Sequence, residues 1–131
     1  MHLALIALAA AAQTAPAQSI DGRWINPAKS VIIDIAPCRE ARCGIVQWAS
    51  DKAKADAADN VPDLVGTTLL SELAPASSTQ WKGRIFVPDK NIRANAKVTV
   101  VGPDQIKVSG CALGGIVCDS QVWTRASDAN P

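Results

Sequence analysis

The sequence contains no tyrosine and only one histidine, one methionine and one phenylalanine among its 131 residues. Met1 and His2 both precede an apolar run at the start of the chain. Without that start, the remaining chain has no histidine, so it cannot form a Ser-His or Cys-His dyad or a histidine-ligated metal site. We therefore expect a protein that is not an enzyme, with no cofactor and no metal.

The sequence also has no large excess of positive or negative charge. Thirteen Lys and Arg residues stand against twelve Asp and Glu residues, and the two signs are interspersed. Because nucleic-acid binding needs clustered Lys and Arg, the sequence predicts no nucleic-acid partner. The balance likewise gives no electrostatic reason to expect adhesion to an acidic membrane. Beyond residue 17 there is also no apolar run long enough for a membrane span.

The first seventeen residues have the pattern of an export signal. Residues 3–12, "LALIALAAAA", form an apolar run that is too short to cross a bilayer as a helix. Ala15-Pro16-Ala17 then has the small-x-small form of a signal-peptidase site. The pattern predicts a signal peptide over residues 1–17 and one mature domain over residues 18–131, periplasmic or secreted. A buried N-terminal helix is the alternative, since the start of the chain has no Lys or Arg.

The chain has four cysteines in two close pairs. Cys38 and Cys43 enclose "REAR", and Cys111 and Cys118 enclose "ALGGIV". Each pair brackets a turn-like segment between strand-like runs, which favours local disulfides. A short loop of this kind stabilises a fold by roughly 2–2.5 kcal/mol in the loop-entropy model. A four-cysteine zinc site is the alternative, but its spacings would be looser than those of zinc ribbons.

Short runs rich in β-branched residues recur along the chain after the leader. They cover residues 21–25, 30–35, 44–49, 66–73, 80–87, 95–102, 104–111 and 116–125. No helical run is long enough for βαβ units. The predicted fold is therefore all-β, a small antiparallel β-barrel of about eight strands with two local disulfides. A closed barrel removes unpaired sheet edges, and a sandwich is the alternative.

One segment interrupts the strand pattern. Residues 50–60, "SDKAKADAADN", are rich in alanine and predict a short helix with Ser50 or Asp51 as its N-cap. The segment has no large apolar residue to bury, so we interpret it as an exposed excursion. A lid over one end of the barrel is the functional alternative.

Gly22-Arg23-Trp24 and Arg125 resemble a feature of the lipocalin-like barrels. In those proteins the indole of a Gly-x-Trp in the first strand lies across one end of the barrel. A basic side chain from the last strand packs on that indole through a cation–π contact. The resemblance implies structural roles for Gly22, Trp24, Trp123 and Arg125.

A wider set of residues is similar to the bacterial secreted family known as domain of unknown function 2147. The set comprises residues 22–24 (GRW), 43–48 (CGIVQW), 66 with 69–70, 81–89 (WKGRIFVPD), 108–111 (VSGC) and 121–125 (QVWTR). The resemblance implies an exported, single-domain, lipocalin-like barrel with no established activity. After Pro88-Asp89 the family tends towards a glycine and then a tyrosine, where this chain has Asn91 and Ala94.

Strand alternation proposes a ligand site inside the barrel. Val46 and Trp48 would share one face of their strand, opposite Ile45 and Gln47. Trp48, Trp81 and Phe86 would surround the lumen, with Arg84 or Gln47 offering a polar contact to a carboxylate or phosphate. The alternative is that these aromatic side chains fill the core and Arg84 points into solvent.

These patterns support two hypotheses of different kinds. The first is reversible binding of a small apolar or amphiphilic ligand in the lumen. The second is an envelope protein-interaction module, an inhibitor or assembly factor, whose surfaces would be residues 50–63 and 111–118. A ligand-sized lumen favours the first, and a packed interior with an exposed apolar patch on the loops favours the second. An acid–base enzyme comes third, because Asp89 would need a carboxylate partner such as Asp34 or Glu72.

Overall fold

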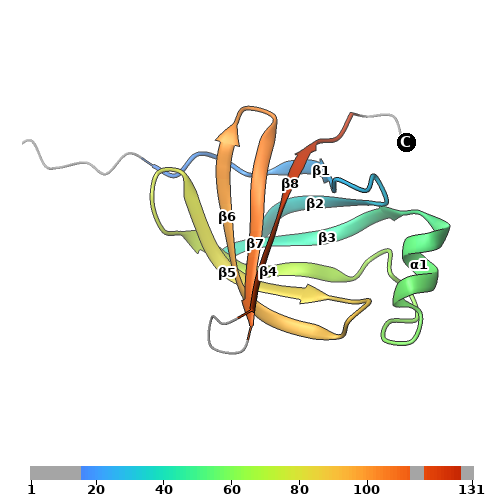
Figure 1. Cartoon of the computed structure of the whole chain (residues 1–131). Coiled ribbons are helices and arrows are strands. Elements are labelled where there is room, and N and C mark those ends of the chain that lie inside the picture. Colours follow the sequence, from blue (N-terminus) through green and yellow to red (C-terminus); the bar gives the residue numbers. More distant parts are fainter. Residues whose placement is uncertain (1–15, 113–116, 128–131) are drawn as a thin grey trace, which may run out of the picture.

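The computed structural model describes residues 16–112 and 117–127, and its strands form one closed antiparallel barrel (Figure 1). The strands are β1 (Gly22–Ile25), β2 (Val31–Cys38), β3 (Ala41–Ala49), β4 (Thr68–Pro75), β5 (Gln80–Val87), β6 (Ile92–Gly102), β7 (Gln105–Ala112) and β8 (Val117–Arg125). The helix α1 (Asp51–Ala57) follows β3. The predicted eight-stranded barrel is confirmed. Of the predicted signal peptide, residues 1–15 lie outside the described residues.

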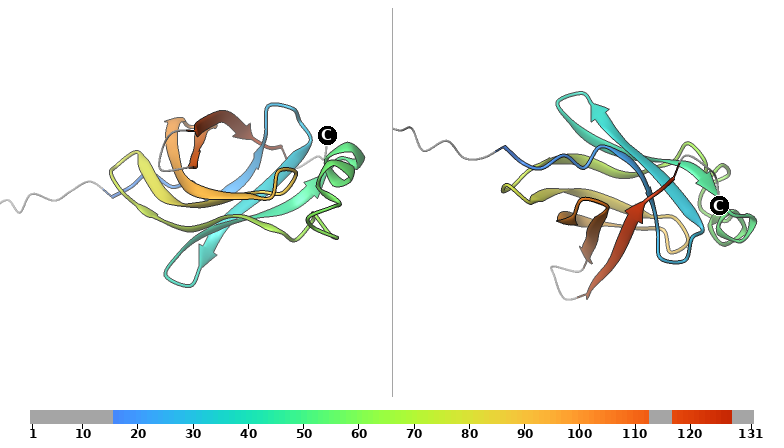
Figure 2. Two further views of the ribbon diagram at one scale, coloured as in Figure 1. Left: turned by 60° about the horizontal axis from the view of Figure 1, so that its bottom comes forward. Right: turned by 90° about the horizontal axis from the view of Figure 1, so that it is seen from above.

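The first and last strands meet at a narrow seam. Each strand pairs with the next, and the circle is closed where Trp24 and Ile25 of β1 pair with Arg125 and Thr124 of β8. The β7–β8 hairpin pairs over a much longer stretch, from Gln105 with Thr124 to Ala112 with Val117. Its far end therefore projects from the body of the barrel, as Figures 1 and 2 show.

Both predicted disulfides are present. Cys38 is bonded to Cys43 across the β2–β3 turn, and Cys111 is bonded to Cys118 between β7 and β8. No described cysteine is free. Local pairing follows because each hairpin brings its two cysteines together, with Cα atoms 5.5 Å and 4.1 Å apart.

The interior is one connected cluster of buried side chains. It holds three tryptophans, Trp24, Trp81 and Trp123. Around them lie aliphatic residues such as Ile35, Leu70, Leu73, Val98, Ile106 and Val108. Close packing of this kind is what a barrel of eight strands needs when side chains alone fill it.

A β-bulge changes the predicted side of Trp48. Ile33 pairs with Val46 but Ile32 pairs with Trp48, so β3 carries one extra residue at this point. As a result Val46 and Ala49 lie in the core, whereas Trp48 and Ile32 do not belong to that cluster. The prediction that Val46 and Trp48 share a face is therefore wrong, because period-2 alternation holds only in strands without a bulge.

Candidate functional site

One end of the barrel is closed by Trp24. Its side chain is 1% exposed, and its indole Nε1 donates a hydrogen bond of 2.9 Å to the carbonyl oxygen of Ile20. The guanidinium Cζ of Arg125 lies 4.1 Å from the ring centroid. The indole therefore has its polar edge satisfied and its face covered by a cation, which makes a stable plug.

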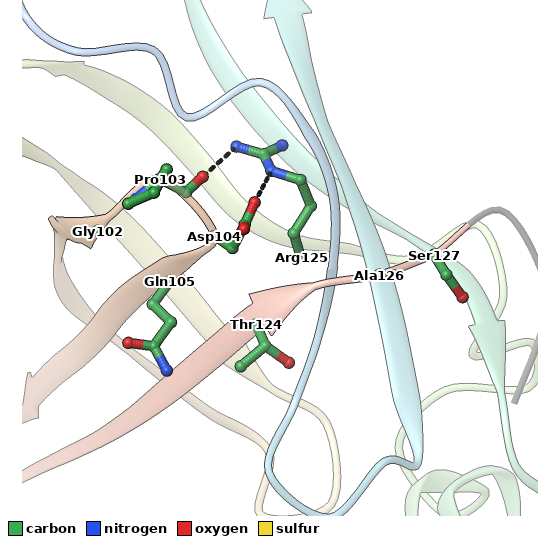
Figure 3. Close-up of a pocket in the computed structure, with 8 residues that line it drawn as sticks. All are labelled: Gly102, Pro103, Asp104, Gln105, Thr124, Arg125, Ala126 and Ser127. Carbon is green, nitrogen blue, oxygen red and sulfur yellow. Dashed lines mark hydrogen bonds and ion pairs between the residues drawn. The ribbon is translucent and has the colours of Figure 1, made fainter.

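The guanidinium of Arg125 is held on several sides. It donates to the carbonyl oxygens of Asp21 and Pro103, each at 3.2 Å, and its Nε lies 3.5 Å from the carboxylate of Asp104. An open depression beside it is lined by residues 102–105 and 124–127 (Figure 3). Because the cation in this depression already has protein partners, we assign Arg125 a structural role.

Gly22 is required by the same arrangement. Its φ is +121°, a conformation that side chains with a Cβ rarely adopt. A Cβ at this position would also lie 2.7 Å from a terminal guanidinium nitrogen of Arg125. The glycine of Gly-x-Trp thus leaves room for the cation that covers the tryptophan.

Residues just before β1 complete this end, and sequence reasoning missed them. Ile20 is fully buried, and the carbonyl oxygen of Gln18 accepts a 2.9 Å hydrogen bond from the indole Nε1 of Trp81. The backbone N–H of Gln18 donates to Ser78. No motif marks these residues. The one signal is a lone isoleucine between the predicted cleavage site and Gly-x-Trp.

The opposite end is covered by a lid, which we define as residues 50–66. Ser50 caps α1 by accepting a 3.1 Å hydrogen bond from the N–H of Ala53, as predicted. Most side chains of residues 50–60 are exposed, as predicted, but Ala57 is 2% exposed and belongs to the core cluster, as does Leu64 at 6% just beyond that segment. Because alanine is small, α1 can bury one face against the barrel without any large apolar side chain. Leu64 lies just beyond the alanine-rich stretch.

Two hydrogen bonds tie the lid to turns on different sides of the barrel. The backbone N–H of Ser50 donates to Ser30 in the β1–β2 turn at 2.8 Å. The side-chain amide of Asn60 donates to the carbonyl oxygen of Pro88 in the β5–β6 turn at 2.7 Å. The segment therefore spans this end of the barrel, where Figure 1 shows α1 beyond the end of β3.

The outer surface of the lid carries one ion pair. The ammonium of Lys52 and the carboxylate of Asp56 are 2.8 Å apart, one helical turn from each other. The hydrogen bond and the negative charge of Asp56 raise the pKa of Lys52, and the charge of Asp89 adds to this. Lys52 is fully exposed, so the pair contributes little to stability.

The five predicted ligand residues lie in three separate places. Trp81 is in the core, with Arg42 over its ring at 5.7 Å. Arg84 and Phe86 are on the outer face of β5, where Arg84 donates to the amide oxygen of Asn95. Gln47 and Trp48 are on the outer side of β3. The structure does not bring these residues together around a lumen.

The outer residues have partners of their own. Phe86 is covered by Arg93, whose Cζ is 4.1 Å from the ring centroid. The side chain of Gln47 accepts a hydrogen bond from Arg23. Trp123, predicted as structural, is 8% exposed and pairs with Ile106 inside the barrel. A second open depression, lined by residues 34, 36–38, 43 and 45–47, lies on the wall formed by β2 and β3.

Residues 16–112 and 117–127 contain neither a metal-binding cluster nor a helix that could span a membrane. These residues contain no group of three or more His, Cys, Asp or Glu side chains arranged to hold a metal ion. In the same residues, no helix is long and apolar enough to cross a membrane.

A family model described as "Uncharacterized protein conserved in bacteria (DUF2147)" matches residues 22–125. The chain belongs to the DUF2147 family. The match begins at Gly22 and ends at Arg125, the two residues that meet over Trp24. No curated protein matches this DUF2147 chain at a significant level.

Among solved structures, this DUF2147 chain is similar to protein HP1028 from the human pathogen Helicobacter pylori, which is described as belonging to the lipocalin family. The TM-score is 0.64, the sequence identity is 17%, and the match covers 84% of each chain. At this identity the likeness shows the fold, which is that of a lipocalin-like barrel.

The departure from the DUF2147 pattern after β5 has a structural explanation. Asn91 has φ of +52°, a left-handed conformation that asparagine tolerates better than most residues. Ala94, where the family tends to have tyrosine, is buried on the inner side of β6. The turn is therefore kept, and the inner wall of β6 is lined by small side chains at Ala94 and Ala96.

Proposed function

We propose that this DUF2147 protein is an exported, non-enzymatic binding protein that takes up one small apolar or amphiphilic ligand at the lid end of its barrel. The observation that carries the proposal is the lid. It spans the end of the barrel through Ser50 and Asn60 and contributes Ala57 and Leu64 to the core. A ligand would enter by displacing it.

The composition of the lid means that its displacement requires little free energy. The apolar side chains that the lid packs on the core are Ala53, Ala57, Val61 and Leu64, of which only two are larger than alanine. Burial of one leucine and one valine contributes on the order of 3–5 kcal/mol. A ligand that buries comparable apolar area beneath the lid offsets that cost.

Export is supported by the cysteines and the leader. Both disulfides close short loops, and such bonds persist in oxidising compartments such as the periplasm. The leader has the apolar run and the small-x-small site of a signal peptide. The absence of histidine and tyrosine after residue 17 supports a role that is not catalytic.

The test is native mass spectrometry on the protein isolated from the envelope of its own host. We expect excess mass that disappears on denaturation. If the mass is that of the oxidised polypeptide alone, four hydrogens below the reduced chain for its two disulfides, a fluorescent fatty acid is then used as probe. A bare mass together with no uptake of the probe would overturn the proposal.

A pair of neighbouring substitutions locates the site. Leu64→Ala removes a buried side chain of the lid, whereas Val65→Ala removes one that is 44% exposed. Because 1.4 kcal/mol corresponds to tenfold, Leu64→Ala should speed ligand dissociation by at least about tenfold and Val65→Ala by less than about twofold. Equal effects would place the ligand elsewhere.

A second candidate function is the protein-interaction module. The observation that favours it is the packed interior, in which Trp24, Trp81 and Trp123 join one cluster. Its surfaces would be residues 50–63 and 111–118. Within the second of these, residues 113–116 lie outside the described residues. Failure of the ligand test with a folded protein would favour this function.

A further inference from the structure

The strands place several of the cations of this chain on one part of the outer barrel surface. Side chains of β5 alternate, so Trp81 and Ile85 point inward while Lys82 and Arg84 point outward. The same alternation places Arg93 and Lys97 of β6 and Lys107 of β7 outward. We define the basic face as these five exposed side chains: Lys82, Arg84, Arg93, Lys97 and Lys107.

The register brings the five cations close together. Lys82 lies directly opposite Lys97, a position at which Cβ atoms are about 4.5–5.5 Å apart. Lys107 and Arg84 are each diagonal to Lys97, at roughly 7–8 Å. Like charges placed directly opposite each other destabilise a sheet. Sheet stability therefore gives no reason for this arrangement.

The protein does not neutralise these charges. Among residues 16–112 and 117–127, no ion pair includes a residue of the basic face. The partners that Arg84 and Arg93 do have are neutral, the amide of Asn95 and the ring of Phe86. The nearest acid in the register is Glu72, in the β4 bulge between the partners of Arg84 and Lys82. The cations are therefore available to an external anion.

The neighbouring outward side chains indicate which anion fits. Val122 lies directly opposite Lys107 and is 41% exposed, and Val101 at the end of β6 is 50% exposed. Apolar side chains beside lysines suit the boundary between headgroups and acyl chains of a bilayer. Single-stranded nucleic acid would need exposed aromatic rings for stacking, but Trp81 and Trp123 point inward and Phe86 is covered by Arg93.

We propose that the basic face docks on the anionic phospholipid headgroups of a membrane surface. The cations are spread over the outer surface of β5, β6 and β7 rather than gathered in a groove. This arrangement matches the phosphates of a membrane surface. Each Lys or Arg near such a surface strengthens binding about fivefold. The expectation of no membrane adhesion rested on the balanced total charge, which does not reveal how strands sort their side chains. This proposal does not rest on the ligand site under the lid.

The experiment is co-sedimentation of the mature protein with two kinds of vesicle. One contains equal parts of phosphatidylglycerol and phosphatidylcholine, and the other phosphatidylcholine alone. We expect binding to the anionic vesicles to be at least about tenfold stronger. It should be lost at about 1 M salt, where the Debye length falls to about 3 Å. No binding, or equal binding to both vesicles, would overturn the proposal.

Two double variants with the same change of net charge test the location. Lys82→Gln with Lys97→Gln should weaken binding to the anionic vesicles about 25-fold. Lys52→Gln with Lys54→Gln, on the exposed surface of α1, should weaken it less than about twofold. Equal losses would mean that charge alone is responsible and would refute a specific face.

Two further measurements accompany these variants. The first double variant should melt no lower than the parent, because it removes the opposed pair of like charges, so a loss of binding cannot be assigned to unfolding. A single-stranded DNA oligonucleotide serves as the competing polyanion. Retention of the oligonucleotide without vesicle binding would replace the membrane with nucleic acid as the partner.

Discussion

At the scale of single residues, the four tryptophans have different roles that sequence alone does not separate. Trp24 is enclosed by Gly22, Ile20 and Arg125, and each of these contacts it or makes room for a group that does. Trp48 is only half-buried and lies outside the core cluster, on the outer side of a β-bulge. The same residue type therefore contributes very differently to stability at the two positions.

This difference gives a direct comparison. Trp24→Ala should lower the free energy of unfolding by about 3–5 kcal/mol, because it leaves a cavity at the closed end and removes the ring under Arg125. Trp48→Ala, at a half-buried outer position, should cost much less. Urea denaturation of both variants is the measurement. Equal losses would show that Trp24 is not the plug of the barrel.

At the scale of elements, β4 and β5 are fitted to each other through one glycine. The register of β4 shifts between Ser71 and Ala74, and Glu72 within this bulge has φ of +54°. Gly83 lies opposite, and a Cβ there would be 2.4 Å from the carbonyl oxygen of Ser71. The backbone of β4 thus comes so close to β5 that only glycine fits.

Gly83→Ala should therefore destabilise the barrel by about 1–3 kcal/mol, because backbone atoms must move to admit the methyl group. Gly102→Ala is the matched control, since nothing lies within 4 Å of a Cβ at that position. It should change the unfolding free energy by less than about 0.5 kcal/mol. Thermal unfolding followed by circular dichroism distinguishes the two. A tolerated Gly83→Ala would show that the bulge adapts.

Some features of the elements can be predicted from the sequence, and others depend on pairing between strands. The strand runs, the Ser50 cap and both disulfides follow from local patterns, and the structure contains all of them. The outer position of Trp48 does not follow, because a bulge is set by pairing with another strand. The burial of Ala57 does not follow either, because alanine carries little hydrophobic signal.

The grouping of the predicted ligand residues differs from the structure for a related reason. The prediction places Arg84 and Phe86 around one lumen with Trp81, but residues an odd number of positions apart in a regular strand lie on opposite faces. Alternation along β5 separates these residues without any pairing, but the register of β5 with β6 becomes visible only in the structure. The clustering of Lys82 with Lys97 depends on that same register and is hidden in a chain of balanced charge.

At the scale of the whole molecule, stability depends on residues that precede the first strand. The family match begins at Gly22, yet Gln18 and Ile20 accept hydrogen bonds from the indoles of Trp81 and Trp24. Ile20 is also fully buried in the core cluster. Residues just before β1 are therefore part of the fold, and Ala17 also packs against the core cluster.

A chain that starts at Asp21 should accordingly be less stable than one that starts at Gln18. It loses the burial of Ile20, and two buried indole N–H groups lose their acceptors. The isoleucine alone should account for a loss of about 2–5 kcal/mol. Each indole donor that water cannot reach adds about 1–3 kcal/mol. Both chains retain Asp21 and Gly22, so the residues that contact the guanidinium of Arg125 are the same in both. Equal melting temperatures would show that the barrel is closed by β1 and β8 alone.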